Sequence, residues 1–316
     1  MSLTTHSVDR AERDMNLPDQ RGGKRPLERP RDRAQRLLLG ALWALKPPRL
    51  WSLPALFYVL ARHYLRSGSR RGELPTPAEA LTGGITGVCS SLDVATLLEG
   101  YARGLFPFSH VGPEKWMAPE QRMVLFPEDF VIEKNLRRKI RNRHFKVTFD
   151  EDFEGVIRGC AELRPGRYPL TWIKPAIIDA YLDLFEAGHA HSVEVWDGDG
   201  RLVGGAYGVA IGRVFFTESQ FNRVRDAAKV GFAVLNCHLQ HWGYVLNDGK
   251  HYTRHLERLG FRLIPRDAFN ALLGQNTQIP GKPRYQALGP TGRWRLDPAL
   301  DPGNWDPKAA AEAVPG

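Results

Sequence analysis

The amino-acid sequence predicts an α+β fold built around a central mixed sheet. Residues 189–196 and 201–210 are two strand-like segments that flank the turn sequence DGDG at residues 197–200, which is typical of a β-hairpin. Residues 212–216 add a third strand, and a long helical segment follows at residues 226–242. Along the chain the elements follow the order helix, strands, helix, strand, helix, strand, which favours this fold class.

The N-terminal part of the chain differs in composition from the rest. Residues 1–36 are polar and show no apolar periodicity, so we expect a disordered basic head. Residues 37–72 are expected to form an extension with two short apolar helices, at residues 37–45 and 53–65. Because arginines border these helices, the extension either lies on an anionic membrane surface or docks on the protein's own surface.

Helix-start and helix-stop signals define most of the remaining segments. Residues 92–103 have helical periodicity, with Ser90 or Ser91 as the N-cap and Gly104 as the stop. The other expected elements are strands at residues 123–126, 145–149, 244–247 and 261–264, and helices at residues 133–141, 153–160, 176–187 and 251–259. Residues 291–316 are rich in Pro, Asp and Ala, which favours a loose C-terminal tail.

Bulk composition narrows the class of protein. The 316 residues carry a net charge of +9, a balance that favours a polyanionic partner, either nucleic acid or an anionic membrane. A basic run at residues 137–143 either follows RNA phosphates or forms a solvated helix face. Three scattered cysteines indicate a reducing compartment. The sequence has no apolar run of about 18 residues and no signal peptide, so we expect a cytoplasmic protein, taken as a monomer, that could be peripheral to the membrane.

The most informative segment is residues 215–229, which is interpreted as a strand, a polar turn and a helix. Within it, Glu218 is a lone carboxylate among Phe215, Phe216 and Phe221. Burying a carboxylate without a partner is unfavourable. Either a structural ion pair or a functional site must therefore explain this acid.

Other chemical patterns in the sequence are weaker. His189 and His191 share one face of a strand, but no clear third zinc ligand accompanies them. His251 and His255 are four residues apart on a helix, but they lack the glutamate of an HExxH sequence. Residues 201–206 fit an acetyl-coenzyme A signature, yet they lie in a strand instead of opening a helix. We therefore expect no metal site.

Several segments resemble the leucyl/phenylalanyl-tRNA–protein transferase family, in the same order along the chain. The resemblance begins with TESQFN at residues 217–222, and GHAHSVEVW at residues 188–196 is nearly verbatim. The other matching segments are residues 100–108, 116–125, 171–173, 202–210, Asp248, 255–260 and 264–269. The resemblance covers about residues 83–273, and the chain is identified as a member of this family.

This resemblance implies a fold and a reaction. It implies a small N-terminal domain, at residues 73–135, and a Gcn5-type acetyltransferase-like (GNAT) domain, at residues 136–290. Such enzymes take leucine or phenylalanine from aminoacyl-tRNA and join it to the N-terminal Arg or Lys of a protein, which is thereby marked for degradation. The ester-to-amide exchange needs a held amine, a proton acceptor and stabilisation of an oxyanion, and it requires no metal or dissociable cofactor.

Two acids carry the chemistry that the resemblance implies. Glu218 matches the acid expected to hold the ammonium of the substrate or the acceptor amine. Asp248 matches the aspartate that activates the attacking amine, directly or through a hydrogen-bond relay. Lys250 stands where the family has a neutral glutamine. This lysine either lowers the pKa of Asp248 and weakens it as a base, or it binds a phosphate or an acidic acceptor.

The resemblance also implies substrate-binding residues. Phe215, Gln220 and Phe232 match positions that line the pocket for the aminoacyl side chain. Trp172 matches a tryptophan near the 3′ adenosine of the tRNA, where stacking on an aromatic ring commonly holds a base, and Trp116 matches a tryptophan of the substrate site. Gln220 replaces a methionine, and a buried amide requires hydrogen bonds that leucine and phenylalanine cannot offer.

These departures leave alternatives beside standard leucine or phenylalanine transfer. One alternative is a divergent transferase that uses a different amino acid or a non-protein amine acceptor. The other is a catalytically silent module that binds tRNA or a membrane.

Overall fold

The computed structural model describes residues 34, 38–40, 42, 53–65, 73–110, 112–163 and 170–312. The head expected to be disordered and most of the helix expected at residues 37–45 lie outside this part of the chain. The helices are α3 (Leu53–Leu65), α4 (Val94–Ala102), α5 (Lys134–Arg141), α6 (Phe153–Ala161), α7 (Pro175–Glu186), α8 (Ala227–His241), α9 (Arg254–Glu257), α10 (Arg266–Asn276) and α11 (Pro307–Glu312). The strands are β1 (Ile85–Val88), β2 (Phe106–Phe108), β3 (Lys115–Met117), β4 (Gln121–Leu125), β5 (Lys146–Phe149), β6 (Ala190–Trp196), β7 (Leu202–Ile211), β8 (Val214–Asn222), β9 (Leu246–Lys250) and β10 (Arg262–Pro265).

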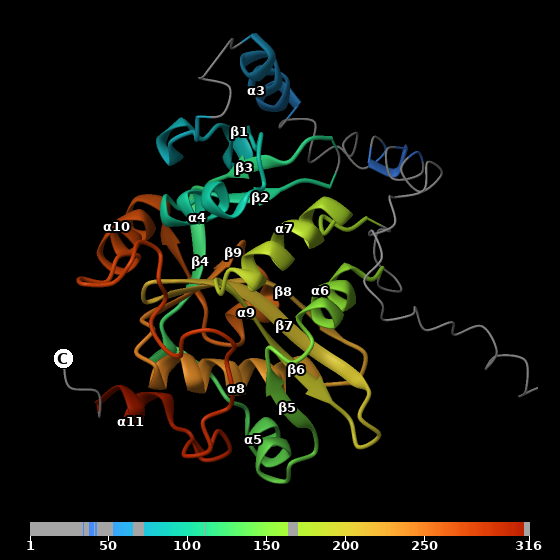
Figure 1. The fold of residues 1–316 in the computed structure, drawn as a ribbon, viewed down its shortest axis with the longest axis vertical. Helices are drawn as coiled ribbons and strands as arrows, with labels where there is room; N and C mark the ends of the chain where they lie inside the picture. Colours follow the sequence, from blue (N-terminus) through green and yellow to red (C-terminus); the bar gives the residue numbers. More distant parts are fainter. Residues whose placement is uncertain are drawn as a thin grey trace, which may run out of the picture.

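Two sheets organise these elements (Figure 1). The small sheet has the strand order β1-β3-β2, and the large one has the order β10-β4-β9-β8-β7-β6-β5. Neighbours in the large sheet are antiparallel except β8 and β9, which run parallel. The prediction of an α+β fold with a central mixed sheet is confirmed. The strand β4 lies inside the large sheet, so the expected domain boundary near residue 135 does not separate the two sheets.

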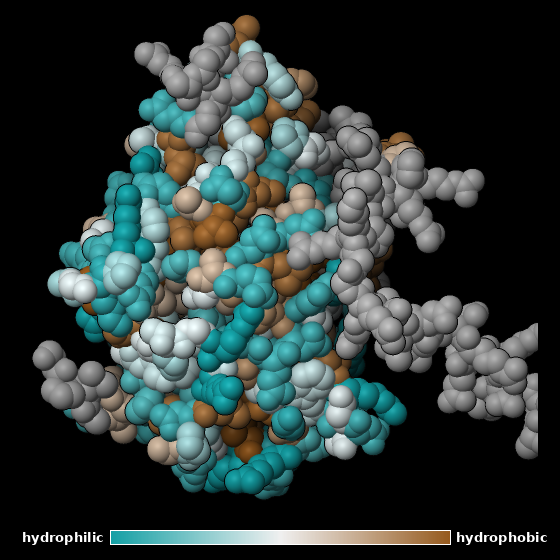
Figure 2. Space-filling model, viewed as in Figure 1, coloured by the Kyte–Doolittle hydropathy of each residue, from teal (hydrophilic) through white to brown (hydrophobic). Residues whose placement is uncertain are grey.

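Helices cover both faces of the large sheet and create two hydrophobic cores. One core lies under α6 and α7 and continues into α4 and the small sheet, and it contains Phe216 and Tyr207. The other lies under α8 and α5 and contains Phe215 and Phe232. On the face shown in Figure 2, hydrophobic residues gather where α4 and α7 lie. Side chains on β8 therefore enter one core or the other according to their parity along the strand.

The N-cap of helix α4 differs from the expectation. The helix begins at Val94, and the carboxylate of Asp93 accepts the backbone N–H of Thr96 at 2.9 Å. The hydroxyl of Ser91 donates to Asp93 instead of capping the helix itself. A carboxylate is a strong N-cap because its oxygen satisfies one of the exposed N–H groups of the first turn.

The C-terminal segment is packed on the protein, so the expectation of a loose tail is wrong for residues 291–312. Trp294 is 1% exposed and lies flat on the ring of His191, with 3.7 Å between ring centroids. Trp305 stacks on Phe130. The prediction from composition was wrong because burial of two tryptophan side chains holds this segment on the protein although the residues between them are polar.

Helix α3 of the N-terminal extension docks on the small sheet. Val59 is buried there, and Arg62 forms an ion pair with Glu79 at 3.0 Å. The opposite side of α3 exposes large apolar side chains, those of Phe57, Tyr58, Tyr64 and Leu65. In the part of the chain that the structure describes, no helix is both long and apolar enough to cross a membrane.

Candidate active site

Strands β8 and β9 run side by side and then separate at the centre of the molecule. Their parallel pairing ends at Phe216 and Asp248. Each strand carries a β-bulge next to this point: Glu218 is the extra residue of β8 relative to β7, and Gly249 is the extra residue of β9 relative to β4. Bulges bend a strand and redirect side chains, and they are over-represented next to active sites. The fork between β8 and β9 is therefore a place where function is expected.

The strand β8 continues through residues that the sequence pattern assigned to a polar turn. It runs to Asn222, so the expected polar turn begins later than the end of the strand expected at Phe216 and occupies residues 223–226. The bulge explains the irregular pattern, because it shifts the alternation of side chains by one residue. As a result Phe216 and Phe221, five positions apart, reach the same hydrophobic core.

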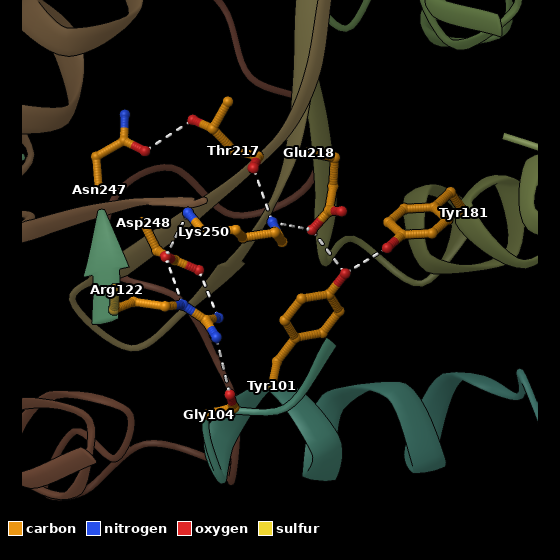
Figure 3. A network of polar contacts seen from close by, with 9 residues as sticks. All are labelled: Tyr101, Gly104, Arg122, Tyr181, Thr217, Glu218, Asn247, Asp248 and Lys250. Carbon is orange, nitrogen blue, oxygen red and sulfur yellow. Dashed lines mark hydrogen bonds and ion pairs between the residues drawn. The ribbon is translucent and has the colours of Figure 1, made fainter. Parts of the chain in front are cut away.

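The carboxylate of Glu218 lies next to Tyr101 and Lys250, and Tyr181 lies beyond Tyr101 (Figure 3). We call these three residues and Tyr207, whose buried hydroxyl is also affected by the charge of Glu218, the Glu218 cage. Its Oε1 accepts hydrogen bonds from the Tyr101 hydroxyl at 2.6 Å and from Lys250 Nζ at 2.7 Å. Tyr101 also bonds to the hydroxyl of Tyr181. The side chain of Glu218 is 0% exposed, and its Oε2 has no hydrogen-bond partner among the described residues. The Tyr207 hydroxyl, on the neighbouring strand β7, is also buried without a hydrogen-bond partner among the described residues.

The negative charge of Glu218 affects all three tyrosines. Burial raises the pKa of Tyr101, Tyr181 and Tyr207 well above the usual range, and the charge of Glu218 raises each of them further. The hydroxyls therefore stay protonated and act as neutral hydrogen-bonding groups. The positive charge in the cage comes from Lys250.

Lys250 bridges the two strands beyond the point where their pairing ends. Its Nζ donates to the carbonyl oxygen of Thr217 at 2.7 Å as well as to Glu218, and its backbone N–H donates to Oδ1 of Asp248 at 2.9 Å. The backbone of Lys250 is left-handed, with φ +63°, which is uncommon for a residue with a side chain and persists only where neighbours enforce it. The lysine that stands beside Asp248 in sequence thus directs its ammonium to Glu218.

Asp248 is held by a buried ion pair with Arg122 on β4. Nε and Nη2 of Arg122 donate to Oδ1 and Oδ2 of Asp248, both at 2.8 Å, and Nη1 donates to the carbonyl oxygen of Gly104 at 3.1 Å. Burial alone would raise the pKa of Asp248, but the charge and hydrogen bonds of Arg122 hold it below the usual range. Both carboxylate oxygens of Asp248 are therefore occupied, and the side chain is 0% exposed.

Some of the expected substrate-binding residues lie away from the Glu218 cage. Phe215 and Phe232 are buried in the core under α8, on the opposite face of the sheet. Trp116 is 2% exposed and packs so tightly on Gly100 that a Cβ there would lie 2.6 Å from its ring. These three side chains therefore belong to the packed interior in this structure.

Trp172 remains close to the site, whereas Gln220 lies on the other face of the sheet. Trp172 is half-buried, and its ring centroid lies 6.5 Å from that of Tyr181 and 5.7 Å from that of Phe108. Gln220 is half-buried on β8 and pairs with Ala206, which belongs to the core under α8, so its side chain lies on the same face as Phe215.

Sequence reasoning missed four residues of the network, namely Tyr101, Arg122, Tyr181 and Tyr207. Tyr101, Arg122 and Tyr207 lie in segments that match the family, but no role was assigned to them. Arg122 precedes an apolar strand segment, residues 123–126, and a charge entering a buried strand is a signal of an ionic partner. The tyrosines carry no such signal, because buried aromatic residues are ordinary core residues.

The histidine pairs considered from the sequence have other surroundings. His191 bonds through Nδ1 to Asp150 at 2.8 Å and stacks on Trp294. Within the described ranges no three His, Cys, Asp or Glu side chains are grouped so as to hold a metal ion.

Comparison with known proteins decides the family. The family model described as leucyl/phenylalanyl-tRNA protein transferase matches residues 124–274. The leucyl/phenylalanyl-tRNA–protein transferase of Methylococcus capsulatus is 44% identical over 216 residues, which are 67% of this chain and 91% of that protein. This chain belongs to the leucyl/phenylalanyl-tRNA–protein transferase family. The family member of Oleidesulfovibrio alaskensis is 40% identical over 245 residues, 76% of this chain and 95% of that protein.

Solved structures resemble this transferase only weakly. A conserved protein of unknown function from Bacteroides thetaiotaomicron matches with a TM-score of 0.32 and 14% identity, over 51% of this chain and 57% of that chain. L-PGS from Bacillus licheniformis matches with a TM-score of 0.30 and 10% identity, over 51% of this chain and 66% of that chain. With TM-scores this low, neither structure informs the fold of the transferase.

Proposed function

We propose that this protein transfers leucine or phenylalanine from aminoacyl-tRNA to the N-terminal Arg or Lys of acceptor proteins and so marks them for degradation. Family membership over nearly the full length of its relatives supports this reaction. The structural observation that carries it is Oε2 of Glu218, a buried carboxylate oxygen with no partner among the described residues. Buried polar atoms are nearly always hydrogen-bonded in proteins, so this oxygen is suited to accept an N–H from a substrate amine.

The reaction forms one bond and breaks another. The nitrogen of the acceptor amine attacks the carbonyl carbon of the aminoacyl ester, and the bond from that carbon to the ribose oxygen of the tRNA breaks. The nitrogen loses a proton and the ribose oxygen gains one. An ammonium has no lone pair with which to attack, so the amine must be neutral when the C–N bond forms.

The pairing of Glu218 with Lys250 suits this requirement. A lone carboxylate would favour the ammonium form of a bound amine, whereas a cation disfavours it. With Lys250 Nζ 2.7 Å from Oε1, Oε2 accepts a hydrogen bond from the amine without stabilising its positive charge. In this account Glu218 holds the amine, Lys250 keeps it neutral, and Asp248 positions the backbone of Lys250 through the 2.9 Å hydrogen bond.

Access to Glu218 requires movement of a side chain, because its carboxylate is enclosed. Lys250, with 9% of its side chain exposed, is the charged neighbour of that carboxylate. We propose that entry of the acceptor amine displaces side chains of the Glu218 cage while the strand fork stays in place.

A second candidate is transfer of a different amino acid. The expected pocket residues Phe215, Gln220 and Phe232 remain our proposal for the aminoacyl side chain. Three hydrogen-bonded polar side chains lie beside Phe215 and Phe232. Thr217 donates to Asn247 at 2.7 Å, and Asn247 donates to Asn236 at 3.1 Å. Polar groups in such a pocket favour a substrate side chain that can hydrogen-bond over a purely apolar one.

The finer architecture is also part of the proposal. The antiparallel order of the large sheet, interrupted by the single parallel pair β8–β9, supports a Gcn5-type acetyltransferase-like domain at about residues 136–290, completed by β4. The small sheet with α4 supports a small N-terminal domain that begins near residue 73.

The exposed apolar side of α3 favours a peripheral contact with an anionic membrane as an additional function. Phe57, Tyr58 and Tyr64 are all more than half exposed, and aromatic residues beside basic ones suit a lipid interface. Deleting residues 1–72 should release the protein from anionic vesicles. Unchanged vesicle binding by the truncated chain would refute the contact.

The transfer reaction is tested directly with labelled amino acids. Leucyl- and phenylalanyl-tRNA are incubated with the protein and a peptide that begins with Arg or Lys, and the same peptide with an acetylated N-terminus is the control. We expect label on the free peptide only. Absence of transfer while charged tRNA still binds would contradict the proposed function, and a panel of other charged tRNAs then tests the second candidate.

A further inference from the structure

His251 lies at the strand fork, directly after Lys250 at the end of β9. Its backbone N–H donates to the carbonyl oxygen of Gly249 at 2.9 Å, which folds the chain back beside the β9 bulge. Asp248 and Lys250 are buried, whereas His251 is an exposed residue. The fork therefore reaches the solvent at a histidine.

The imidazole of His251 packs against two aromatic rings of strand β2. Its ring centroid lies 5.4 Å from that of Phe106 and 5.9 Å from that of Phe108, edge-on in both cases. Nζ of Lys250 lies 5.7 Å from the Phe106 ring centroid, so this ring borders the Glu218 cage. The Phe108 ring lies 5.7 Å from that of Trp172. The imidazole thus contacts one ring that borders the cage and one ring that adjoins Trp172.

The ring nitrogens of His251 have no hydrogen-bond partner among the described residues. The two acids of the fork differ in this respect. Both oxygens of Asp248 accept from Arg122, and Oε1 of Glu218 accepts from the cage. With Oε2 of Glu218 holding the amine, neither acid has an unoccupied oxygen for the proton that the amine loses. The imidazole has a nitrogen for it.

The charges around His251 keep its ring neutral. Contact with the neighbouring rings excludes water, and this burial together with the charge of Arg122 lowers the pKa of His251 to about 4. Lys250 acts in the same direction, and Asp248 opposes them. A neutral imidazole has one nitrogen that can accept a proton. The same cations make the imidazolium a strong acid, so the ring passes on a proton that it has received.

We propose that His251 is a catalytic residue that carries the proton of the transfer reaction from the amine nitrogen to the ribose oxygen. This proposal rests on the proposed transfer function and deepens it. As the C–N bond forms, a ring nitrogen of His251 accepts the proton that the amine nitrogen loses. As the bond from the carbonyl carbon to the ribose oxygen breaks, the imidazolium returns this proton to the ribose oxygen. The ring is then neutral again, and Glu218 and Asp248 keep their charges throughout.

The test compares His251→Ala and His251→Gln with the wild type in single turnovers, with saturating leucyl-tRNA and a peptide that begins with Arg. Both variants should be slower by about 100-fold, a usual contribution of general acid–base catalysis. Glutamine keeps hydrogen-bonding groups at this position but carries no proton. Imidazole added at constant ionic strength should restore much of the rate of His251→Ala. His144→Ala is the control, because His144 is also exposed and lies edge-on to a phenylalanine ring; it should transfer at the wild-type rate with or without imidazole.

The outcomes separate the two proposals. A wild-type rate in His251→Gln would overturn the role of His251 and leave the transfer function in place. The same conclusion follows if His251→Ala is slow, melts at the wild-type temperature and does not respond to imidazole. Absence of transfer by the wild type itself would overturn both proposals.

Discussion

Lys250 donates a 2.7 Å hydrogen bond to Glu218 from the far side of a strand fork, so a side chain connects β8 and β9 where their backbone pairing has ended. The same ammonium satisfies the carbonyl of Thr217. The pair is buried, and Oε2 of Glu218 has no hydrogen-bond partner in the described part of the chain. These features make the pair the centre of the proposed chemistry.

Glu218→Gln should slow transfer by about 100-fold or more, because it removes the charged acceptor for the amine and leaves Lys250 without its partner. The rate is measured in single turnovers with charged tRNA and a peptide beginning with Arg. Glu154→Gln is the matched control, since Glu154 forms an exposed pair with Arg158 on α6. Wild-type rates in Glu218→Gln would remove Glu218 from the active site.

Tyr207→Phe should stabilise the protein and impair its function. The hydroxyl of Tyr207 is buried without a partner in the described structure, and such a group costs about 1–3 kcal/mol. We expect the free energy of unfolding in urea to rise by about 1 kcal/mol and the KM for the acceptor peptide to increase. A lower stability with an unchanged KM would show that the hydroxyl serves the fold and does not meet the substrate.

Arg122→Gln should destabilise the protein severely. It breaks a buried ion pair and leaves Asp248 charged and enclosed, a change that typically costs about 3–5 kcal/mol. Urea unfolding measures the loss. Arg158→Gln, which breaks an exposed pair, should change stability by less than about 1 kcal/mol. Similar losses in the two variants would contradict the structural role assigned to Arg122.

His251 should make the stability of the protein depend on pH. Burial and the charge of Arg122 lower its pKa from 6.5 to about 4, so the folded state favours the neutral ring. Its contribution is complete above pH 6.5 and is lost as the pH falls from 6.5 to 4. Because His251 as a whole residue is exposed, solvent screening reduces the size of this loss. Glu194, with its pKa raised by burial to about 7, acts in the opposite direction in part of this range.

The comparison of wild type with His251→Phe isolates this effect, because Glu194 is present in both. Urea unfolding at pH 7 and at pH 4.5 should show a smaller loss of stability in the variant. An equal loss in both proteins would exclude His251 as the titrating group.

The sequence allowed prediction of elements whose signals are local. The DGDG turn at residues 197–200 predicted the hairpin of β6 and β7, and periodicity predicted α8 within one residue at each end. Glu218 was identified because an acid among phenylalanines is unusual. In each case the neighbouring residues alone determine the signal.

What could not be predicted depends on contacts between distant segments. The bulge at Glu218 lies where β8 still pairs with β7 but no longer pairs with β9. The partner of Asp248 is Arg122, which lies 126 residues away along the chain. The sequence alone does not reveal that these two residues come into contact in the folded protein. Lys250 was expected either to lower the pKa of Asp248 or to bind a phosphate or an acidic acceptor. Its charge and its backbone N–H do help to lower the pKa of Asp248, but its ammonium donates to Glu218, a partner that the sequence did not indicate.

The pH dependence of the single-turnover rate at saturating peptide tests the central claim most directly. If Lys250 keeps the amine on Glu218 neutral, Lys250→Gln should remain active at high pH, but the acid limb of its profile should lie about 1 pH unit higher than in the wild type. Lys250→Arg should keep the wild-type limb. An identical acid limb in the wild type and Lys250→Gln would contradict the account.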